Sequence, residues 1–99
     1  MNAPSLSERE LQLIAQVFRR HPEVLSVRLF GSRAKGTHTP RSDVDLAIWG
    51  EVDGLAAEAI AAELDELPLP YHFDVKPFES IKLEALREHI QRVGLPVYP

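Results

Sequence analysis

No cysteine occurs among the 99 residues of the chain, so disulfide bonds and thiolate metal sites are excluded. Long hydrophobic runs are also missing, because no stretch approaches the ~20 apolar residues that a membrane-spanning helix needs. The N-terminal residues lack the basic and apolar regions of a signal peptide. We therefore expect a cytoplasmic protein without a membrane partner.

Basic side chains are scarce: 11 Lys and Arg stand against 15 Asp and Glu, for a net charge of -4. Non-specific binding to nucleic acid depends on basic contacts with phosphates, so a nucleic-acid partner is not expected. The charges are also segregated. Residues 28–41 contain four basic residues and no acid, whereas residues 42–75 contain nine acids and no Lys or Arg. A basic loop therefore precedes an acidic strand.

The length and the 44% hydrophobic content predict one domain, residues 1–99, with a single core and at most one active site. Helical spacing of apolar residues predicts a first helix that starts at a capping-box serine, Ser5 or Ser7, and stops at Pro22. Further helices are predicted over residues 55–67 and 81–93, with Asp53 and Ser80 as N-caps, and a helical turn over residues 32–35. Strands are predicted over residues 24–30, 43–49 and 71–78, with a short edge strand near residues 97–98. The fold class is α/β (α+β): a mixed sheet of three to four strands packed against about four helices, in the order α-β-α-β-α-β-α.

Periodicity also predicts which face of each element is buried. On the first strand, alternation predicts that three residues share one side: Leu25, Val27 and Leu29. In the last helix, four residues form the predicted apolar stripe: Leu83, Leu86, Ile90 and Val93.

The first strand ends in Gly31-Ser32. A glycine at this point can adopt positive φ and allows the backbone to approach a ligand, and Ser32 adds a hydroxyl group beside backbone N–H groups. Arg33 and Lys35 follow in the same turn. This turn is a candidate phosphate-binding site, although exposed loop cations are often only solvated.

Asp43 and Asp45 stand two residues apart on the second strand, so their side chains point to the same face. Two such carboxylates repel each other unless a cation lies between them. Solvation of both acids at the end of the strand is the structural alternative. A third carboxylate, Asp74, lies on the third strand between His72 and Lys76.

Three carboxylates, a Gly-Ser turn and a basic loop indicate metal-assisted phosphoryl or nucleotidyl transfer. Mg²⁺ prefers oxygen ligands and is usually bound through one or two carboxylates together with substrate phosphates. Two metal ions ~4 Å apart can stabilise the attacking and leaving oxygens of an in-line displacement.

Residues 29–36 (LFGSRAKG) and 42–48 (SDVDLAI) resemble the defining motif of the DNA polymerase beta-type nucleotidyltransferase superfamily. Within it, the small size of the chain is similar to that of the minimal nucleotidyltransferases, the MntA-like antitoxins of HEPN/MNT toxin–antitoxin systems. The resemblance implies a nucleotidyltransferase-type fold. It also implies that Gly31 and Ser32 bind the nucleotide triphosphate, and Arg33 and Lys35 are candidates for further contacts with the nucleotide.

Further roles are implied by the same resemblance. Asp43, Asp45 and Asp74 would be the catalytic carboxylates and the ligands of two Mg²⁺ ions, and Asp74 would also help to deprotonate the acceptor. ATP would be the substrate, and AMP would be transferred to a tyrosine hydroxyl of a helical HEPN toxin. The alternative is a binding module that neutralises such a partner by complex formation without catalysis.

Two interpretations remain open for several other residues. His38 and His72 are candidate general bases or ligands, although neither has a partner at metal-binding spacing in the sequence. Trp49 is a candidate for stacking on a base, with packing in the core as the alternative. Lys76 is a candidate partner of Asp74 or of a phosphate, and Arg41 is a weaker candidate for phosphate contact.

Overall fold

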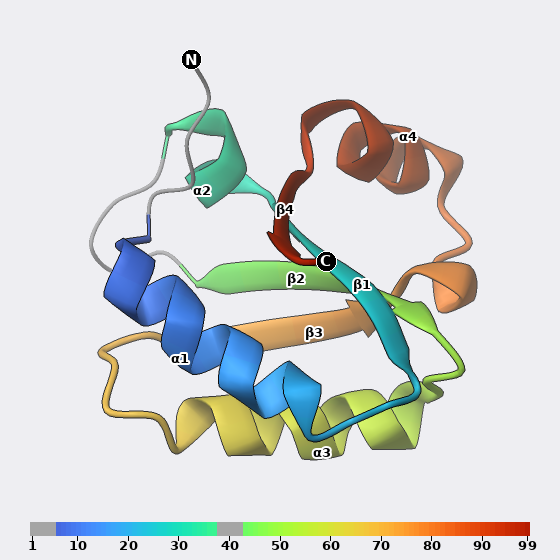
Figure 1. The fold of residues 1–99 in the computed structure, drawn as a ribbon. Coiled ribbons are helices and arrows are strands. Elements are labelled where there is room, and N and C mark those ends of the chain that lie inside the picture. The colour runs from blue at the N-terminus through green and yellow to red at the C-terminus, as the bar shows by residue number, and fades with distance from the viewer. Residues whose placement is uncertain (1–5, 38–42) are drawn as a thin grey trace.

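The computed structural model describes residues 6–37 and 43–99. The elements follow in the order α1 (Glu8–Arg19), β1 (Val24–Phe30), α2 (Ser32–Lys35), β2 (Val44–Gly50), α3 (Gly54–Asp65), β3 (Phe73–Pro77), the 3₁₀-helix η1 (Phe78–Ser80), α4 (Glu84–Val93) and β4 (Leu95–Tyr98) (Figure 1). No helix in the described parts of the chain is long and apolar enough to cross a membrane.

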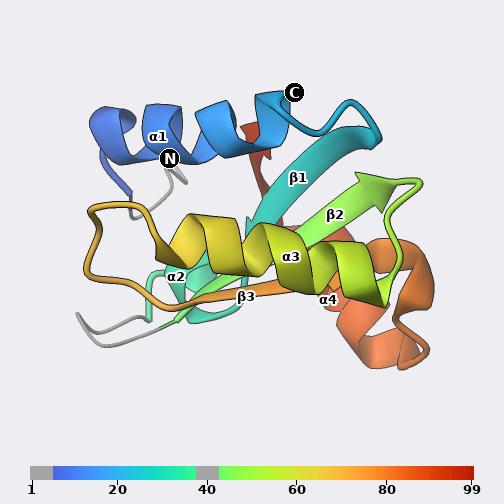
Figure 2. The ribbon, with the colours of Figure 1, turned by 90° about the horizontal axis from the view of Figure 1, so that it is seen from below.

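The four strands form one mixed sheet in the order β3-β2-β1-β4. β1 pairs antiparallel with both β2 and β4, whereas β2 pairs parallel with β3. The α1 and α3 helices lie side by side over one face of this sheet, and α4 lies on the other face (Figures 1 and 2). The predicted mixed sheet with about four helices is therefore confirmed, and the predicted edge strand is its fourth strand.

Two hydrophobic clusters separate these layers. The larger one packs α1 and α3 against inward-facing residues of the central strands, among them Val27, Leu29, Leu46 and Ile48. The smaller one lies under η1 and α4 and contains Phe30, Ala47, Phe78, Ile81 and Ile90. Because neighbouring residues of a strand point to opposite faces, Leu46 of β2 lies in the larger cluster and Ala47 in the smaller one. Asp45 and Trp49 share the face of Ala47.

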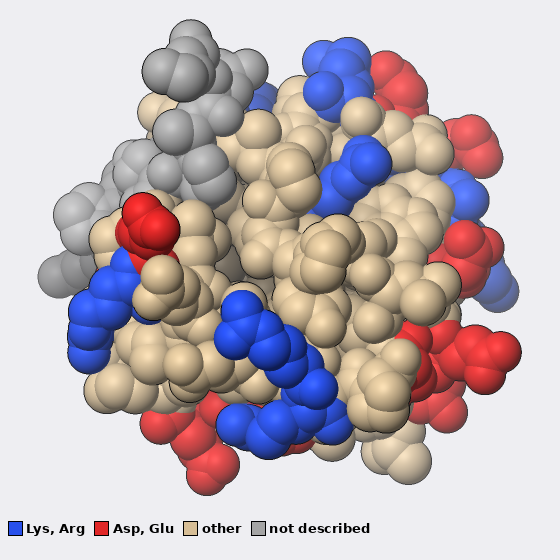
Figure 3. Space-filling model, in the orientation of Figure 1, with Lys and Arg blue, Asp and Glu red and all other residues tan. Residues whose placement is uncertain are grey.

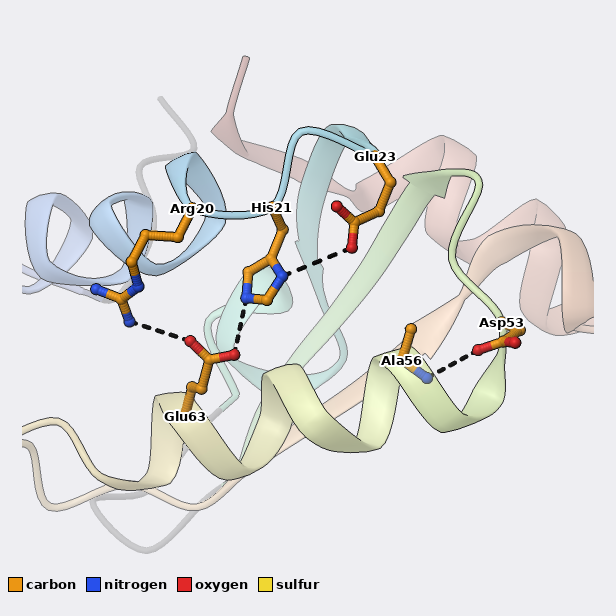
Figure 4. A network of polar contacts seen from close by, with 6 residues as sticks. All are labelled: Arg20, His21, Glu23, Asp53, Ala56 and Glu63. Carbon is orange, nitrogen blue, oxygen red and sulfur yellow. Dashed lines mark hydrogen bonds and ion pairs between the residues drawn. The ribbon is translucent and has the colours of Figure 1, made fainter.

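Local sequence signals explain how the helices begin. The predicted capping box forms at Ser7: the backbone N–H of Glu10 donates to the Ser7 hydroxyl (3.2 Å), and the Ser7 N–H donates to the Glu10 carboxylate (2.8 Å). Asp53 caps α3 by accepting from the N–H of Ala56 at 2.8 Å (Figure 4). Both caps satisfy helix donors that lack an intrahelical partner.

The end of α1 is held to α3 by ion pairs around Glu63. The Glu63 carboxylate accepts from Arg20 at 3.1 Å and from His21 at 2.8 Å, and the other ring nitrogen of His21 lies 3.6 Å from Glu23 (Figure 4). Burial raises the pKa of Glu63, but its hydrogen bonds to Arg20 and His21 outweigh that effect and leave the pKa below its usual value. The ionised carboxylate therefore stabilises this contact between the helices.

Two details of the predicted fold were wrong. Leu25 does not share the buried side of β1 with Val27 and Leu29, and it is 70% exposed. The pairing of β1 with β2 shifts register between Val24 and Ser26. An irregularity of this kind breaks strict alternation, so the predicted face holds only from Val27 onward.

The last helix begins later than predicted, at Glu84, and Ser80 does not cap it. Residues 78–80 form η1 instead, and Leu83 is 67% exposed rather than part of a buried stripe. The Arg87 guanidinium explains this local structure because it donates to the carbonyls of Phe78 (3.1 Å) and Ile81 (3.0 Å) and covers the Phe78 ring. A contact made from within the following helix therefore supports the turn that precedes it.

Candidate active site

The Gly-Ser turn joins the end of β1 to α2. Gly31 has φ 77° and ψ -156°, a region of backbone space that is essentially restricted to glycine. A Cβ atom at this position would collide with Oδ2 of Asp45. The glycine is thus required both by the backbone and by the close approach of a predicted metal ligand.

The short α2 helix keeps the turn compact. The carbonyl of Gly31 accepts from the N–H groups of Ala34 and Lys35, at 3.1 Å each. Gly36 closes the helix in the left-handed conformation, with φ 80°, as glycine commonly does directly after a helix. The side chain of Lys35 is exposed beside this turn.

Strand register brings the predicted site residues together. In the antiparallel pair, Phe30 lies opposite Asp45, and in the parallel pair Asp45 lies opposite Asp74. Neighbouring strands are about 4.8 Å apart, so Phe30, Asp45 and Asp74 form a row across three adjacent strands, and Gly31 follows Phe30 directly, with its backbone close to the Asp45 carboxylate. The sequence spacing alone did not predict that Asp74 is the direct neighbour of Asp45.

The carboxylates of this row affect one another electrostatically. Burial raises the pKa of Asp45, and the negative charges of Asp74 and Asp43 raise it further, while Lys76 acts in the opposite direction. Asp43 lies just before β2 and is exposed. The ionised form of Asp45 is therefore penalised in the metal-free protein, as expected for acids that face a shared cation site.

Lys76 lies on the same face of β3 as Asp74, and its ammonium group donates to Asp74 Oδ2 at 2.9 Å. The side chains are 41% and 43% exposed, respectively. Of the two partners that the sequence left open for Lys76, the structure shows Asp74.

The donor set suits Mg²⁺, because the three predicted ligands offer only carboxylate oxygens. The carboxylate that would collide with any Cβ at Gly31 and the raised pKa of Asp45 are consistent with such a site. However, no group of three or more His, Asp or Glu side chains within residues 6–37 and 43–99 is arranged closely enough to hold a metal ion.

Arg33 and Lys35 occupy different environments, although both were predicted to bind nucleotide. Arg33 is only 3% exposed, and its guanidinium lies 4.5 Å from the centre of the Tyr71 ring. The Tyr71 hydroxyl in turn donates to Glu10 at 2.7 Å. Arg33 thus connects α2 with the start of α1 and the segment before β3. This burial favours a structural role for Arg33, whereas the exposed Lys35 is accessible to a ligand.

The remaining candidates are placed as follows. Trp49 stacks on Phe78 at 4.5 Å and is covered by Arg28, which favours the packing alternative. His72 lies 3.5 Å from Asp65, and the His72 side chain is 66% exposed. Asp65 also accepts from the N–H of Phe73 at 3.0 Å, a role in positioning β3 that the sequence did not indicate. His38, Arg41 and most of the predicted loop lie outside the described residues.

A groove of about 530 Å³ lies at the opposite end of β1 and β2, where Val24 pairs with Gly50. It is lined in part by Leu25 and Trp49. Its acidic residues are Glu23, Glu51 and Glu79. Figure 3 shows red side chains on the side of the molecule where η1 and the β2–α3 connection lie in Figure 1. Asp45 and Asp74 do not line this groove, and the Gly-Ser turn and Asp45 lie at the other end of β1 and β2.

The motif, the strand register and the carboxylates now allow comparison with known proteins. Residues 12–99 match the family model described as Polymerase beta, Nucleotidyltransferase. The chain belongs to this nucleotidyltransferase family. It is 31% identical over 90 residues to the Haemophilus influenzae protein named Probable protein adenylyltransferase MntA, a match that covers 89% of this chain and 78% of that relative.

Solved structures of similar fold agree with this membership. A minimal nucleotidyltransferase is 27% identical, with a TM-score of 0.70 and 89% of each chain covered. A toxin–antitoxin complex with AMP-PNP contains a chain with 23% identity and a TM-score of 0.73, covering 93% of this chain and 73% of that one. The complex of a tri-AMPylated Shewanella oneidensis HEPN toxin with its MNT antitoxin gives 20% identity and a TM-score of 0.72, covering 93% and 71%. The last two likenesses show the fold alone. Together, these matches confirm the resemblance to the minimal nucleotidyltransferases.

Proposed function

We propose that this nucleotidyltransferase transfers AMP from ATP to a tyrosine hydroxyl of a helical HEPN toxin and thereby acts as its antitoxin. The observation that carries the proposal is that Asp45 lies beside Asp74 on the neighbouring strand and also against Gly31 at the end of β1. This arrangement brings a phosphate-binding type of turn next to two carboxylates. The named adenylyltransferase relative and the solved complex with an AMPylated HEPN toxin support the choice of nucleotide and partner.

The proposal gives each site residue a role. Gly31 and Ser32 bind the triphosphate at the turn, and the exposed Lys35 adds a positive charge beside it. Arg33 is predicted from the sequence to contribute as well, although its burial makes it a support of α2 instead of a direct contact. Lys35 is therefore the basic residue of the motif whose removal most directly tests nucleotide binding.

The carboxylates have two roles in the proposal: they bind the metal ions, and one of them accepts the proton of the acceptor hydroxyl group. Asp43, Asp45 and Asp74 would hold two Mg²⁺ ions, which neutralise charge on the phosphates and stabilise the attacking and leaving oxygens. The acceptor hydroxyl oxygen forms a bond to the α-phosphorus, the bond to the bridging oxygen of the β-phosphate breaks, and pyrophosphate leaves. Asp74 accepts the proton of the hydroxyl group. The acceptor belongs to the partner.

One observation favours the alternative function, in which the chain neutralises its partner by binding it without catalysis. Asp74 accepts a hydrogen bond from Lys76, and no three His, Asp or Glu side chains among the described residues are grouped closely enough to hold a metal ion. A chain that remained in this state would neutralise its partner only by binding it. The two functions therefore differ in whether label from ATP reaches the partner.

The test is to incubate the purified chain and its cognate HEPN partner with Mg²⁺ and ATP labelled on the α-phosphate. We expect label on the partner with the wild type, and none with the Asp43→Asn/Asp45→Asn double variant. Glu58→Gln, which removes an exposed acid from α3, is the control and should label normally. Equal neutralisation by wild type and double variant without any label would refute the enzymatic proposal and support the binding module.

Thermal unfolding gives an independent measurement of the site. Mg²⁺ with ATP should raise the melting temperature of the wild type because it binds only the folded state. Asp45→Asn should abolish this increase. The same substitution should raise the melting temperature of the metal-free protein, since it removes a partly buried charge that Asp74 and Asp43 repel. A wild type unaffected by Mg²⁺ and ATP would contradict the proposed site.

A further inference from the structure

Lys76 is the residue of the candidate site that the family motif does not explain. It stands two positions after Asp74 on β3, so both side chains lie on one face of the sheet. The parallel register places Asp74 beside Asp45 and Lys76 beside Ala47. Because Ala47 has no polar group, β2 offers no competing partner at that position, and the ammonium group reaches back to Asp74 Oδ2 at 2.9 Å.

The charge balance of the site explains why a cation is useful there. The negative charges of Asp43 and Asp74 both act on that of Asp45. Repulsion of this kind destabilises a folded protein unless a positive charge compensates it. Lys76 supplies a positive charge that lies 2.9 Å from Asp74 Oδ2.

We propose that Lys76 is an internal counter-ion that occupies Asp74 in the metal-free protein and competes with a divalent cation for this carboxylate. A metal ion that uses Asp74 must first displace the ammonium group. Lys76 is thus a positioning residue, since it acts through Asp74 and not on the reacting atoms. The inference rests on the proposed function only in taking Asp74 as a metal ligand.

The partial exposure of the pair makes this exchange feasible. With side chains 41% and 43% exposed, Lys76 can move into solvent without leaving a buried charge behind. Exposed ion pairs contribute at most about 1 kcal/mol, which corresponds to about a fivefold change in an equilibrium constant. Competition from Lys76 should therefore weaken metal binding by a few-fold without preventing it.

The test measures the dissociation constant of Mn²⁺, in the absence of nucleotide, by calorimetry and by the paramagnetic relaxation of water. Lys76→Met should bind Mn²⁺ about three- to fivefold more tightly than the wild type, because the competing charge is gone. Lys76→Arg keeps the charge and should restore an affinity close to that of the wild type. Lys82→Met, which removes an exposed lysine beyond η1, controls for the change in net charge and should have little effect.

Each result decides the inference. Tighter Mn²⁺ binding in Lys76→Met, with rescue by arginine, supports the competition. Unchanged or weaker Mn²⁺ binding in Lys76→Met overturns it, as does the absence of Mn²⁺ binding in both wild type and variant. Weaker binding of ATP together with unchanged Mn²⁺ affinity would also overturn it and would assign Lys76 to a phosphate.

This experiment is separable from the test of the proposed function. Mn²⁺ binding requires neither the partner nor AMP transfer. A chain that shows the Lys76 effect but never labels its partner would refute the transferase proposal and retain the inference. A chain that labels its partner but shows no effect of Lys76 on Mn²⁺ binding would support the transferase proposal and refute the inference about Lys76.

Discussion

Replacing Gly31 with alanine tests the close contact between the Gly-Ser turn and the carboxylates. Gly31→Ala forces a Cβ atom into a backbone region that is essentially restricted to glycine, at a cost of about 1–3 kcal/mol. The new atom would also collide with Asp45 Oδ2. Since the colliding atom is the tip of a side chain that can rotate, we add only about 1 kcal/mol, at the low end of the cost of overpacking. The expected loss of stability is about 2–4 kcal/mol.

Gly36→Ala is the matched control. Gly36 also has positive φ, 80°, but a Cβ atom there would meet nothing within 4 Å. Its cost should be that of a left-handed non-glycine residue alone, about 1–2 kcal/mol. In a domain of this size, 1 kcal/mol corresponds to a change in melting temperature of about 4–8 °C, so the two variants should be distinguishable.

The free energies of unfolding should be measured by urea denaturation without metal. A double-mutant cycle with Asp45→Ala isolates the contact from the backbone strain. Gly31→Ala should cost about 1 kcal/mol less in the Asp45→Ala background, because the collision is removed. Equal costs in both backgrounds would refute the proposed contact, and a cost no larger than that of Gly36→Ala would refute the strain at Gly31.

Two further substitutions test the scaffold. Glu63→Gln should lower the free energy of unfolding at neutral pH by up to about 1 kcal/mol, a limit set by the exposure of the pair; Glu58→Gln should leave it unchanged. Because the folded pKa of Glu63 lies below the unfolded value of 4.5, this stabilisation is present above that value and is lost as the pH falls through the folded pKa. A difference from wild type that persists unchanged at strongly acidic pH would contradict this assignment. Ser7→Ala should cost about 1 kcal/mol through loss of the capping box, whereas Ser80→Ala, at a serine that caps no helix, should cost much less; comparable urea midpoints for the two variants would argue against the caps as described.

Much of the fold could be predicted from local sequence patterns. The bounds of β1, the cap and extent of α1, the Asp53 cap of α3 and the short α2 helix closed by Gly36 all follow from residues within a few positions of one another. Errors occurred where a distant or irregular feature intervened. The register shift near the start of β1 exposed Leu25. The Arg87 contacts hold residues 78–81 in a turn with η1, and residues 81–83, predicted as the first turn of the last helix, are not helical.

In the candidate site, too, some features follow from the local sequence and others depend on the tertiary structure. The sequence by itself determined the Gly-Ser turn, because the geometry of a turn is a local property. The alternation of a strand also predicts a shared face for Asp43 and Asp45, but β2 begins at Val44, after Asp43. Only the tertiary structure decided that Asp74 is the neighbour of Asp45, that Lys76 bonds Asp74, and that Arg33 is buried while Lys35 is exposed. These outcomes depend on the pairing of strands far apart in the chain and on packing against Tyr71, which no spacing within the motif encodes.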